Sequence, residues 1–128
     1  MPTEKRNLDE LFARLTKYFS PRIVGAVDGV YVKVVKVKGP DVPWHTHEAQ
    51  DEMFFVVAGM LTVEREEREP VVLTPGEFLI VERGTRHRAF SNEECRLMLV
   101  ENKETEHTGD VRAAITKSIE EQRDPDEL

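Results

Sequence analysis

Seven short apolar segments fill the middle of this chain, with turn residues between them and no helical pattern to connect them. In order, the segments are residues 22–27, 30–38, 52–58, 61–66, 71–73, 78–81 and 96–100. The breaks fall at Asp28-Gly29, Gly39-Pro40, Gly59, Glu67-Arg68, Pro75-Gly76, Gly84 and Ser91-Asn92. Short strands at close spacing, without intervening helices, are typical of an antiparallel sandwich or barrel. The sequence therefore predicts an all-β domain over residues 21–102.

The two ends of the chain differ from this region. Apolar side chains recur at helical spacing in residues 7–19, at Leu8, Leu11, Phe12, Leu15, Tyr18 and Phe19. Asn7 is a candidate N-cap, and Pro21 follows the end of the pattern. Because a helix with one apolar stripe must bury it, residues 1–20 are expected to form a helix that packs on the barrel. Residues 103–128 are expected to be a polar tail, with a short, weakly amphipathic helix over residues 110–122.

Size and charge exclude several classes of protein. The 128 residues fit one domain, and the single cysteine, Cys95, excludes an internal disulfide framework. The net charge of -7 disfavours binding to nucleic acid and to anionic membrane surfaces. The N-terminus has no apolar signal-peptide region, and the longest apolar run is far shorter than the roughly 20 residues that span a bilayer. We therefore expect a cytoplasmic protein with no nucleic-acid or membrane partner.

A group of histidines and one acid carries the chemistry that the sequence offers. His45 and His47 share a face if they lie on a strand, although two exposed polar residues on an edge strand would show the same pattern. Glu52 opens an apolar strand and shares its face with inward residues, where an unpaired carboxylate would be costly. With His87, these residues offer three imidazoles and one carboxylate, which suit a first-row divalent metal such as Fe, Mn, Ni, Co or Zn. His107 lies in a polar stretch and is left out of this set.

Two motifs in the sequence resemble those of the cupin superfamily. Residues 39–59, GPDVPWHTHEAQDEMFFVVAG, resemble the first cupin motif, and residues 76–91, GEFLIVERGTRHRAFS, resemble the second. The chain departs from the family pattern at Glu82, where the family has proline, and at Ser91, where it has asparagine. Neither is a metal position. The short link between the motifs is similar to that of small, single-domain microbial cupins.

The resemblance implies a small antiparallel β-barrel of the jelly-roll kind, with one divalent metal ion held by His45, His47, Glu52 and His87. Beyond these ligands, the candidates for a pocket wall are Phe54, Val56, Phe78, Ile80 and Phe90, for which an ordinary core position is the alternative.

The chemistry at this site stays open, because cupin folds carry many functions. One hypothesis is a metal-dependent enzyme, such as a dioxygenase or an isomerase, and the other is a non-catalytic protein that binds a small molecule or metal. Arg83, Arg86 and Arg88 lie near His87 and could bind an anionic substrate, but solvated surface charge is the favoured interpretation. Glu82 is a possible general base, although it sits at a turn.

The strand over residues 52–58 is apolar on both faces. Met53, Phe55 and Val57 alternate with the inward residues, and a strand that is apolar on both faces is covered on both faces. The N-terminal helix can cover part of this outer surface, and a second subunit can cover the rest. A homodimer is therefore expected, with coverage by the chain's own helices as the alternative.

Overall fold

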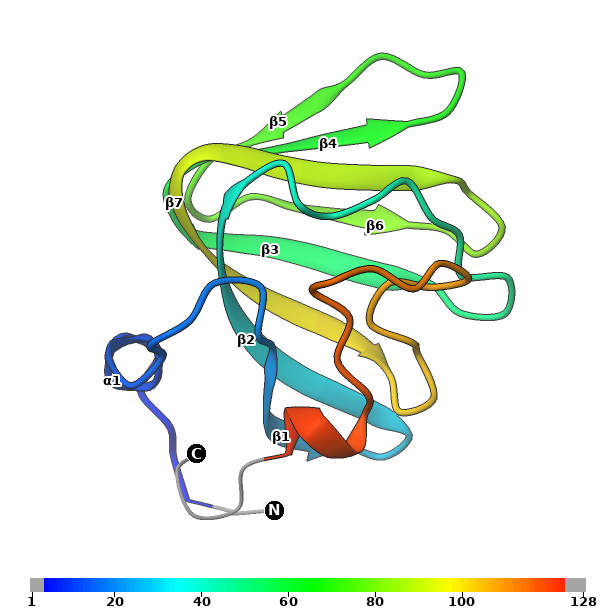
Figure 1. Ribbon diagram of the computed structural model, residues 1–128. Helices are drawn as coiled ribbons and strands as arrows, with labels where there is room; N and C mark the ends of the chain where they lie inside the picture. The colour runs from blue at the N-terminus through cyan, green and yellow to red at the C-terminus, as the bar shows by residue number, and fades with distance from the viewer. Residues whose placement is uncertain (1–3, 124–128) are drawn as a thin grey trace.

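The computed structural model describes residues 4–123 and contains one α-helix, seven strands and one 3-10 helix. The elements are α1 Leu8–Ala13, β1 Arg22–Val27, β2 Val30–Gly39, β3 Glu52–Ala58, β4 Leu61–Arg65, β5 Val71–Leu73, β6 Phe78–Val81, β7 His87–Asn102 and the 3-10 helix η1 Glu120–Gln122. Every strand pairing is antiparallel (Figure 1). The expected all-β fold is confirmed. Among residues 4–123, no helix has the length and apolar character needed to cross a membrane.

Strand β7 organises the barrel, because it belongs to both of its sheets. Residues 87–90 pair with β4, which in turn pairs with β5. Residues 91–102 pair with β2, and residues 96–101 also pair with β3 on the other side. The larger sheet thus runs β1-β2-β7-β3-β6. The break expected at Ser91-Asn92 is wrong, because both residues lie inside β7. They follow the residues that pair with β4 and precede most of those that pair with β2 and β3, so the strand passes from one sheet to the other at this point.

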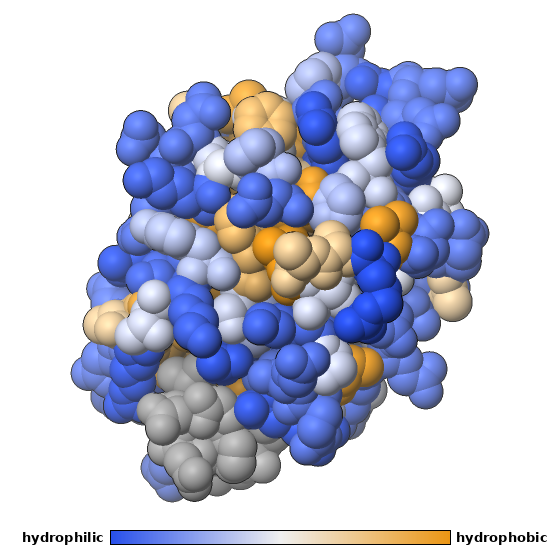
Figure 2. All heavy atoms as spheres, in the orientation of Figure 1, coloured by the Kyte–Doolittle hydropathy of each residue, from blue (hydrophilic) through white to orange (hydrophobic). Residues whose placement is uncertain are grey.

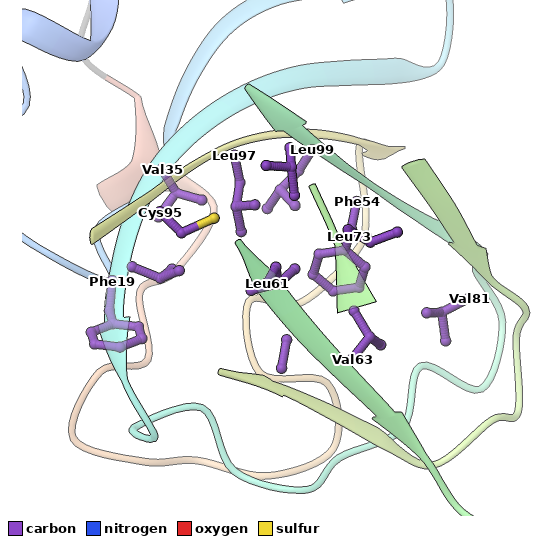
Figure 3. Packing of buried hydrophobic residues seen from close by; sticks show 13 residues of the cluster. Phe19, Val35, Phe54, Leu61, Val63, Leu73, Val81, Cys95, Leu97 and Leu99 are labelled. Atoms are coloured by element: carbon purple, nitrogen blue, oxygen red, sulfur yellow. The ribbon is translucent and has the colours of Figure 1, made fainter. Parts of the chain in front are cut away.

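The core fills the space between the two sheets. Alternate residues of β3, β4 and β7 are buried, as the period of a strand requires. Figure 3 shows this cluster, whose labelled members are Phe19, Val35, Phe54, Leu61, Val63, Leu73, Val81, Cys95, Leu97 and Leu99. Cys95 is completely buried, and burial raises the pKa of its thiol to about 11. Figure 2 shows that the outer surface is mostly hydrophilic, with smaller apolar areas near the middle of the face in view.

One glycine is required where β3 turns into β4. Gly59 has φ +86°, and a Cβ at this position would lie 2.5 Å from the carbonyl oxygen of Glu94 and 2.9 Å from the Cα of Cys95. Only glycine allows both this backbone conformation and the close approach to β7.

The N-terminal helix packs on the sheet as expected, but it is shorter than the pattern over residues 7–19. Asn7 caps it, since its Oδ1 accepts a hydrogen bond from the backbone N–H of Glu10 at 3.1 Å. Leu11 and Phe12 are buried in a second apolar cluster together with residues of β1 and β2. The helix ends at Ala13, and Phe19 adopts φ +56° and joins the barrel core instead of the helical stripe.

The C-terminal segment, residues 103–123, contains no α-helix. The helix expected over residues 110–122 is wrong, since only η1 is helical there. The segment is nevertheless partly buried: Thr105, Thr108 and Gln122 have at most 1% of their surface exposed. Figure 1 shows it as an irregular trace in front of the strands. It is held by turns and side-chain hydrogen bonds, which leave no periodic pattern. The remainder of the expected tail, residues 124–128, lies outside the described residues.

Candidate metal centre

The structure brings His45, His47, Glu52 and His87 together, and we call these four residues the His–Glu cluster. Glu52 is the first residue of β3 and His87 the first of β7, while the other two lie in the connection from β2 to β3. All four are buried, and their ligand atoms lie within 4.8 Å of one another. His45 forms a single bridge with His87, in which each backbone N–H donates to the other's carbonyl oxygen at 2.9 Å. This bridge places the two side chains side by side without a continuous strand.

Hydrogen bonds at Nδ1 fix the tautomer of two histidines, His45 and His87, so that Nε2 is free to coordinate a metal. Nδ1 of His45 lies 2.7 Å from the carbonyl oxygen of Pro43, and Nδ1 of His87 lies 2.9 Å from that of Thr85. Because a carbonyl oxygen only accepts, each Nδ1 must carry the proton, which leaves a lone pair on Nε2. Burial lowers the pKa of His45 to about 4, so this ring is neutral at physiological pH. A neutral ring with a free Nε2 is the form that coordinates metal.

The atoms that face each other inside the cluster have no protein partners. Nε2 of His47, Nε2 of His87 and Oε1 of Glu52 are sealed from solvent and make no hydrogen bond within the described chain. Oε1 of Glu52 lies 3.5 Å from the first nitrogen and 3.4 Å from the second, which is long for a hydrogen bond. Buried polar atoms rarely lack partners, and three such atoms on neighbouring side chains are compatible with a shared ion between them.

The distances also fit one ion. Two ligands that each lie about 2.1 Å from a metal are about 3.0 Å apart when adjacent and about 4.2 Å apart when opposite. The separations of 3.4 and 3.5 Å are close to the adjacent value, and the outermost pair, within 4.8 Å, would draw in by a few tenths of an ångström. The four residues therefore fit a mononuclear divalent metal.

A buried polar network lies behind Glu52, and the sequence interpretation missed it. Glu101 of β7 is the direct cross-strand neighbour of Glu52. Nζ of Lys33 lies 2.5 Å from Oε1 of Glu101 and 2.5 Å from Oε1 of Gln122. Burial and the charge of Glu52 raise the pKa of Glu101 well above its ordinary value, although Lys33 opposes this. Burial alone would raise the pKa of Glu52, but the groups facing it, including His47, lower it well below its ordinary value. Strand parity offered a signal, since Glu101 lies on the same face of β7 as the inward residues Leu97 and Leu99.

A cavity adjoins the cluster. His45, Glu52, Phe54, Leu99 and His107 line it together with other apolar residues of the strands. It encloses about 500 Å³ of space between atoms, its open mouth included, but a water-sized sphere fits into only about 50 Å³ of it. Typical pockets for drug-sized ligands have volumes of roughly 300–1,000 Å³, so this space suits a small molecule.

The predicted pocket wall is correct only in part. Phe54 lines the cavity, and Val56 is a fully buried core residue. Phe78 and Ile80 are 58% and 49% exposed on the outer face of β6, so their assignment to the wall is wrong. Their parity on β6 is opposite to that of the buried Val81. Phe90 lies outside the cavity, beside the guanidinium of Arg88.

The three arginines near His87 are surface residues. Arg83 pairs with Asp51 at 3.3 Å and Arg86 with Glu66 at 3.4 Å, and each of these side chains is about half exposed or more. The Arg88 guanidinium lies 2.8 Å from Glu64 and stacks near Trp44. None of them lines the cavity. The favoured interpretation as surface charge therefore agrees with the structure.

Comparisons with known proteins agree with the motifs. The family model of the cupin domain (Cupin_2) matches residues 31–101, which is more than half of the chain. A cupin-2 domain protein from Shewanella frigidimarina is 30% identical, with a TM-score of 0.73, and the match covers 76% of this chain and 93% of that protein. Protein NMB1881 from Neisseria meningitidis is also 30% identical, with a TM-score of 0.71 and coverage of 77% and 99%.

A curated relative, YdbB from Bacillus subtilis, is 35% identical over 63 residues, a match that spans 49% of this chain and 56% of YdbB. The matched family region holds strands β3 to β6, all but one residue each of β2 and β7, and all four residues of the His–Glu cluster. The chain thus belongs to the cupin family, as a small cupin-domain protein.

Proposed function

We propose that this protein holds one divalent metal ion through the three histidines and Glu52 of the His–Glu cluster, and binds a small molecule beside it. The observation that carries the proposal is the convergence of three sealed, unpartnered atoms: Nε2 of His47, Nε2 of His87 and Oε1 of Glu52. Four protein ligands on an octahedral ion leave two positions for water or substrate. A bound ion would polarise a coordinated oxygen or, if it is iron or manganese, would give access to dioxygen chemistry.

The chain's own residues would bind and shield the small molecule. The walls of the cavity are mostly apolar, so they would exclude water from a group bound next to the cluster. The 50 Å³ that a water-sized sphere can occupy suits a small molecule. A dioxygenase or isomerase-like reaction at the metal is the function that we favour.

A non-catalytic binding protein is the second candidate, and one observation favours it. Glu52 is the only carboxylate among the residues that line the cavity. As a metal ligand it would not serve as a free general base. Glu82, the alternative base, is exposed and does not line the cavity.

Metal analysis tests the proposal directly. Protein purified without added metal is analysed by mass spectrometry for Fe, Mn, Ni, Co and Zn, and the metal-free protein is then titrated with each ion. We expect one ion per chain, with an affinity that decreases as the pH is lowered, because protons compete for the imidazoles. Because burial lowers the pKa of His45 to about 4, protons compete with the metal for this residue only at a lower pH. An oxygen-uptake screen on the loaded protein then separates an oxygenase from a binding protein.

The variant Glu52→Gln keeps the shape of the site and removes its only anion. We expect its metal affinity to fall at least about tenfold. Glu82→Gln is the matched control, since Glu82 is an exposed carboxylate near the cluster that is not a ligand. Equal metal affinity in the two variants would refute the assignment of Glu52.

A further inference from the structure

His107 lies beside the His–Glu cluster but does not belong to it. The residue lines the same cavity as His45 and Glu52, although its nitrogens are not among the clustered ligand atoms. It comes from the C-terminal segment, which the sequence interpretation treated as a polar tail. Its position therefore depends on how that segment is attached to the barrel.

The segment is fixed directly onto the loop that carries two of the metal ligands. Oδ1 of Asp110 accepts a hydrogen bond from the backbone N–H of Thr46 at 2.9 Å, and the N–H of Asp110 donates to the carbonyl oxygen of Thr46 at 3.1 Å. A Cβ at Gly109 would overlap that carbonyl oxygen and would lie 2.9 Å from Cδ2 of His45. Thr46 stands between the two ligand histidines, so the segment and the cluster share one loop.

The hydrogen bonding of His107 is opposite to that of the ligand histidines. The backbone N–H of Lys117 donates to Nδ1 of His107 at 2.8 Å, so this nitrogen carries no proton. Burial lowers the pKa of His107 to about 4, and the neutral ring then carries its proton on Nε2. In His45 and His87 the Nδ1 atom donates and Nε2 has the lone pair. Because the lone pair of His107 is already used, this ring is a hydrogen-bond donor and not a fifth ligand.

The donor of His107 has no acceptor in the described part of the chain. No hydrogen bond to its Nε2 is present among residues 4–123, and this atom is not one of the sealed polar atoms that lack a partner. The cavity around it is mostly apolar, and its one carboxylate, Glu52, is turned to the cluster. The described part of the chain therefore offers no acceptor for this N–H, and either water or a molecule that enters the cavity can take that place.

We propose that His107 donates its Nε2–H to an oxygen of the metal-bound molecule, and that the site takes small carboxylates. This inference rests on the proposed function, because a metal must hold the molecule. A divalent ion with one anionic ligand, Glu52, keeps a net positive charge, which favours a monoanion. A carboxylate offers one oxygen to the metal and a second to His107, and the small free volume suits a compact one.

The experiment uses cobalt(II)-loaded protein and formate as the probe, with affinity read from the visible absorption of cobalt. We compare the wild type with His107→Phe, His107→Gln and the exposed neighbour control Glu106→Gln. Loss of one hydrogen bond to a charged acceptor is expected to weaken formate binding about tenfold in His107→Phe. His107→Gln, which retains an N–H donor, should recover part of this loss. Cobalt affinity should stay within about threefold of the wild type in all variants.

Two results would overturn the inference. Equal formate affinity in the wild type and His107→Phe would show that His107 makes no contact with the bound anion. A tenfold loss of cobalt affinity in His107→Phe would make His107 a ligand or a support of the ligands. Failure of the wild type to bind cobalt would instead refute the proposed function.

A measurement on the unmutated protein covers the case in which His107→Phe does not fold. Long-range proton–nitrogen spectra of the zinc-loaded protein report the tautomer of each histidine. We expect His107 to carry its proton on Nε2, and this proton signal to move when formate is added. A proton on Nδ1, or no movement at saturating formate, contradicts the inference.

Discussion

The barrel strands and the C-terminal segment both supply side chains to the cavity, but they are held in place differently. Strand β7 pairs with β2 from Asn102 back to Ser91, so the backbone ladder itself fixes the position of each inward residue. Residues 103–123 have no such ladder and depend on individual contacts, such as those of Asp110 with Thr46 and of Gln122 with Lys33. A single substitution should therefore disturb the segment more easily than the strands.

The largest effect is expected where the two regions meet, at Lys33. Lys33→Met removes the cation that contacts Glu101, the cross-strand neighbour of Glu52. Breaking a buried ion pair from one side destabilises a protein by about 3–5 kcal/mol. Urea denaturation of the metal-free protein measures this loss. The double variant Lys33→Met/Glu101→Gln should recover much of it, and Lys38→Met, at an exposed position of the same strand, should change little. A double variant no more stable than the single one would contradict the ion-pair explanation.

A smaller effect, confined to the segment, is expected from Gly109→Ala. The new Cβ would overlap the carbonyl oxygen of Thr46 at a residue with φ +55°, and we expect a loss of about 2 kcal/mol. Amide hydrogen exchange should accelerate in residues 103–123 and not in β7. Gly76→Ala is the matched control, since Gly76 also has positive φ, at +89°, but no atom lies within 4 Å of its Cβ position. Equal acceleration in the strands would show that the segment is part of the same cooperative unit.

The pH dependence of stability tests the depressed pKa of His107, a shift that the cluster residue His45 shares. Its pKa is about 4 in the folded protein, against about 6.5 in the unfolded chain. Above pH 6.5 neither state is protonated, and as the pH falls toward 4 only the unfolded state gains the proton. Protonation of His107 in the unfolded state therefore lowers the free energy of unfolding progressively across this window, by about 2 kcal/mol at pH 5. His107→Phe should remove this contribution, so the difference in unfolding free energy between the variants should change between pH 7 and pH 5. A constant difference would contradict the depressed pKa.

The smallest effect on stability, but a large one on assembly, is expected at the outer face of β6. Phe78 and Ile80 are 58% and 49% exposed there and pair directly with Phe55 and Met53 of β3. We propose that a second copy of the chain covers this patch. Phe78→Glu should convert dimer to monomer in light scattering at micromolar concentration, with little change in melting. Val72→Glu, at an exposed apolar residue of β5, is the control. A wild-type mass of one chain would refute the dimer.

Strand periodicity and two motifs were sufficient to predict the barrel and the four residues of the His–Glu cluster. Alternation along residues 52–58 correctly placed Glu52 on the buried face, because in a strand the side-chain direction follows from the sequence position alone. The polar pair Ser91-Asn92 was misinterpreted as a turn, since a strand that bends between two sheets also accepts polar residues at the bend.

The role of the C-terminal segment was not predictable in the same way. Its burial arises from contacts between residues far apart in the chain, such as Gln122 with Lys33, and its own sequence shows only a weak helical pattern. His107 depends on a backbone donor at Lys117, which has no signature in the sequence. Lys33 and Glu101 were accessible in principle, because both have the parity of inward residues in their strands.

Because Cys95 is buried in the barrel core, its reaction with a thiol reagent can be used to measure how often the barrel opens. This thiol is the single one in the sequence, is fully buried in β7, and has a pKa raised to about 11 by burial. A thiol in this state reacts slowly with electrophiles, because the reactive form is the exposed thiolate. The rate at which a thiol reagent labels the native protein therefore measures how often the barrel opens. Comparing that rate with and without bound metal would show how far the ion holds the strands closed.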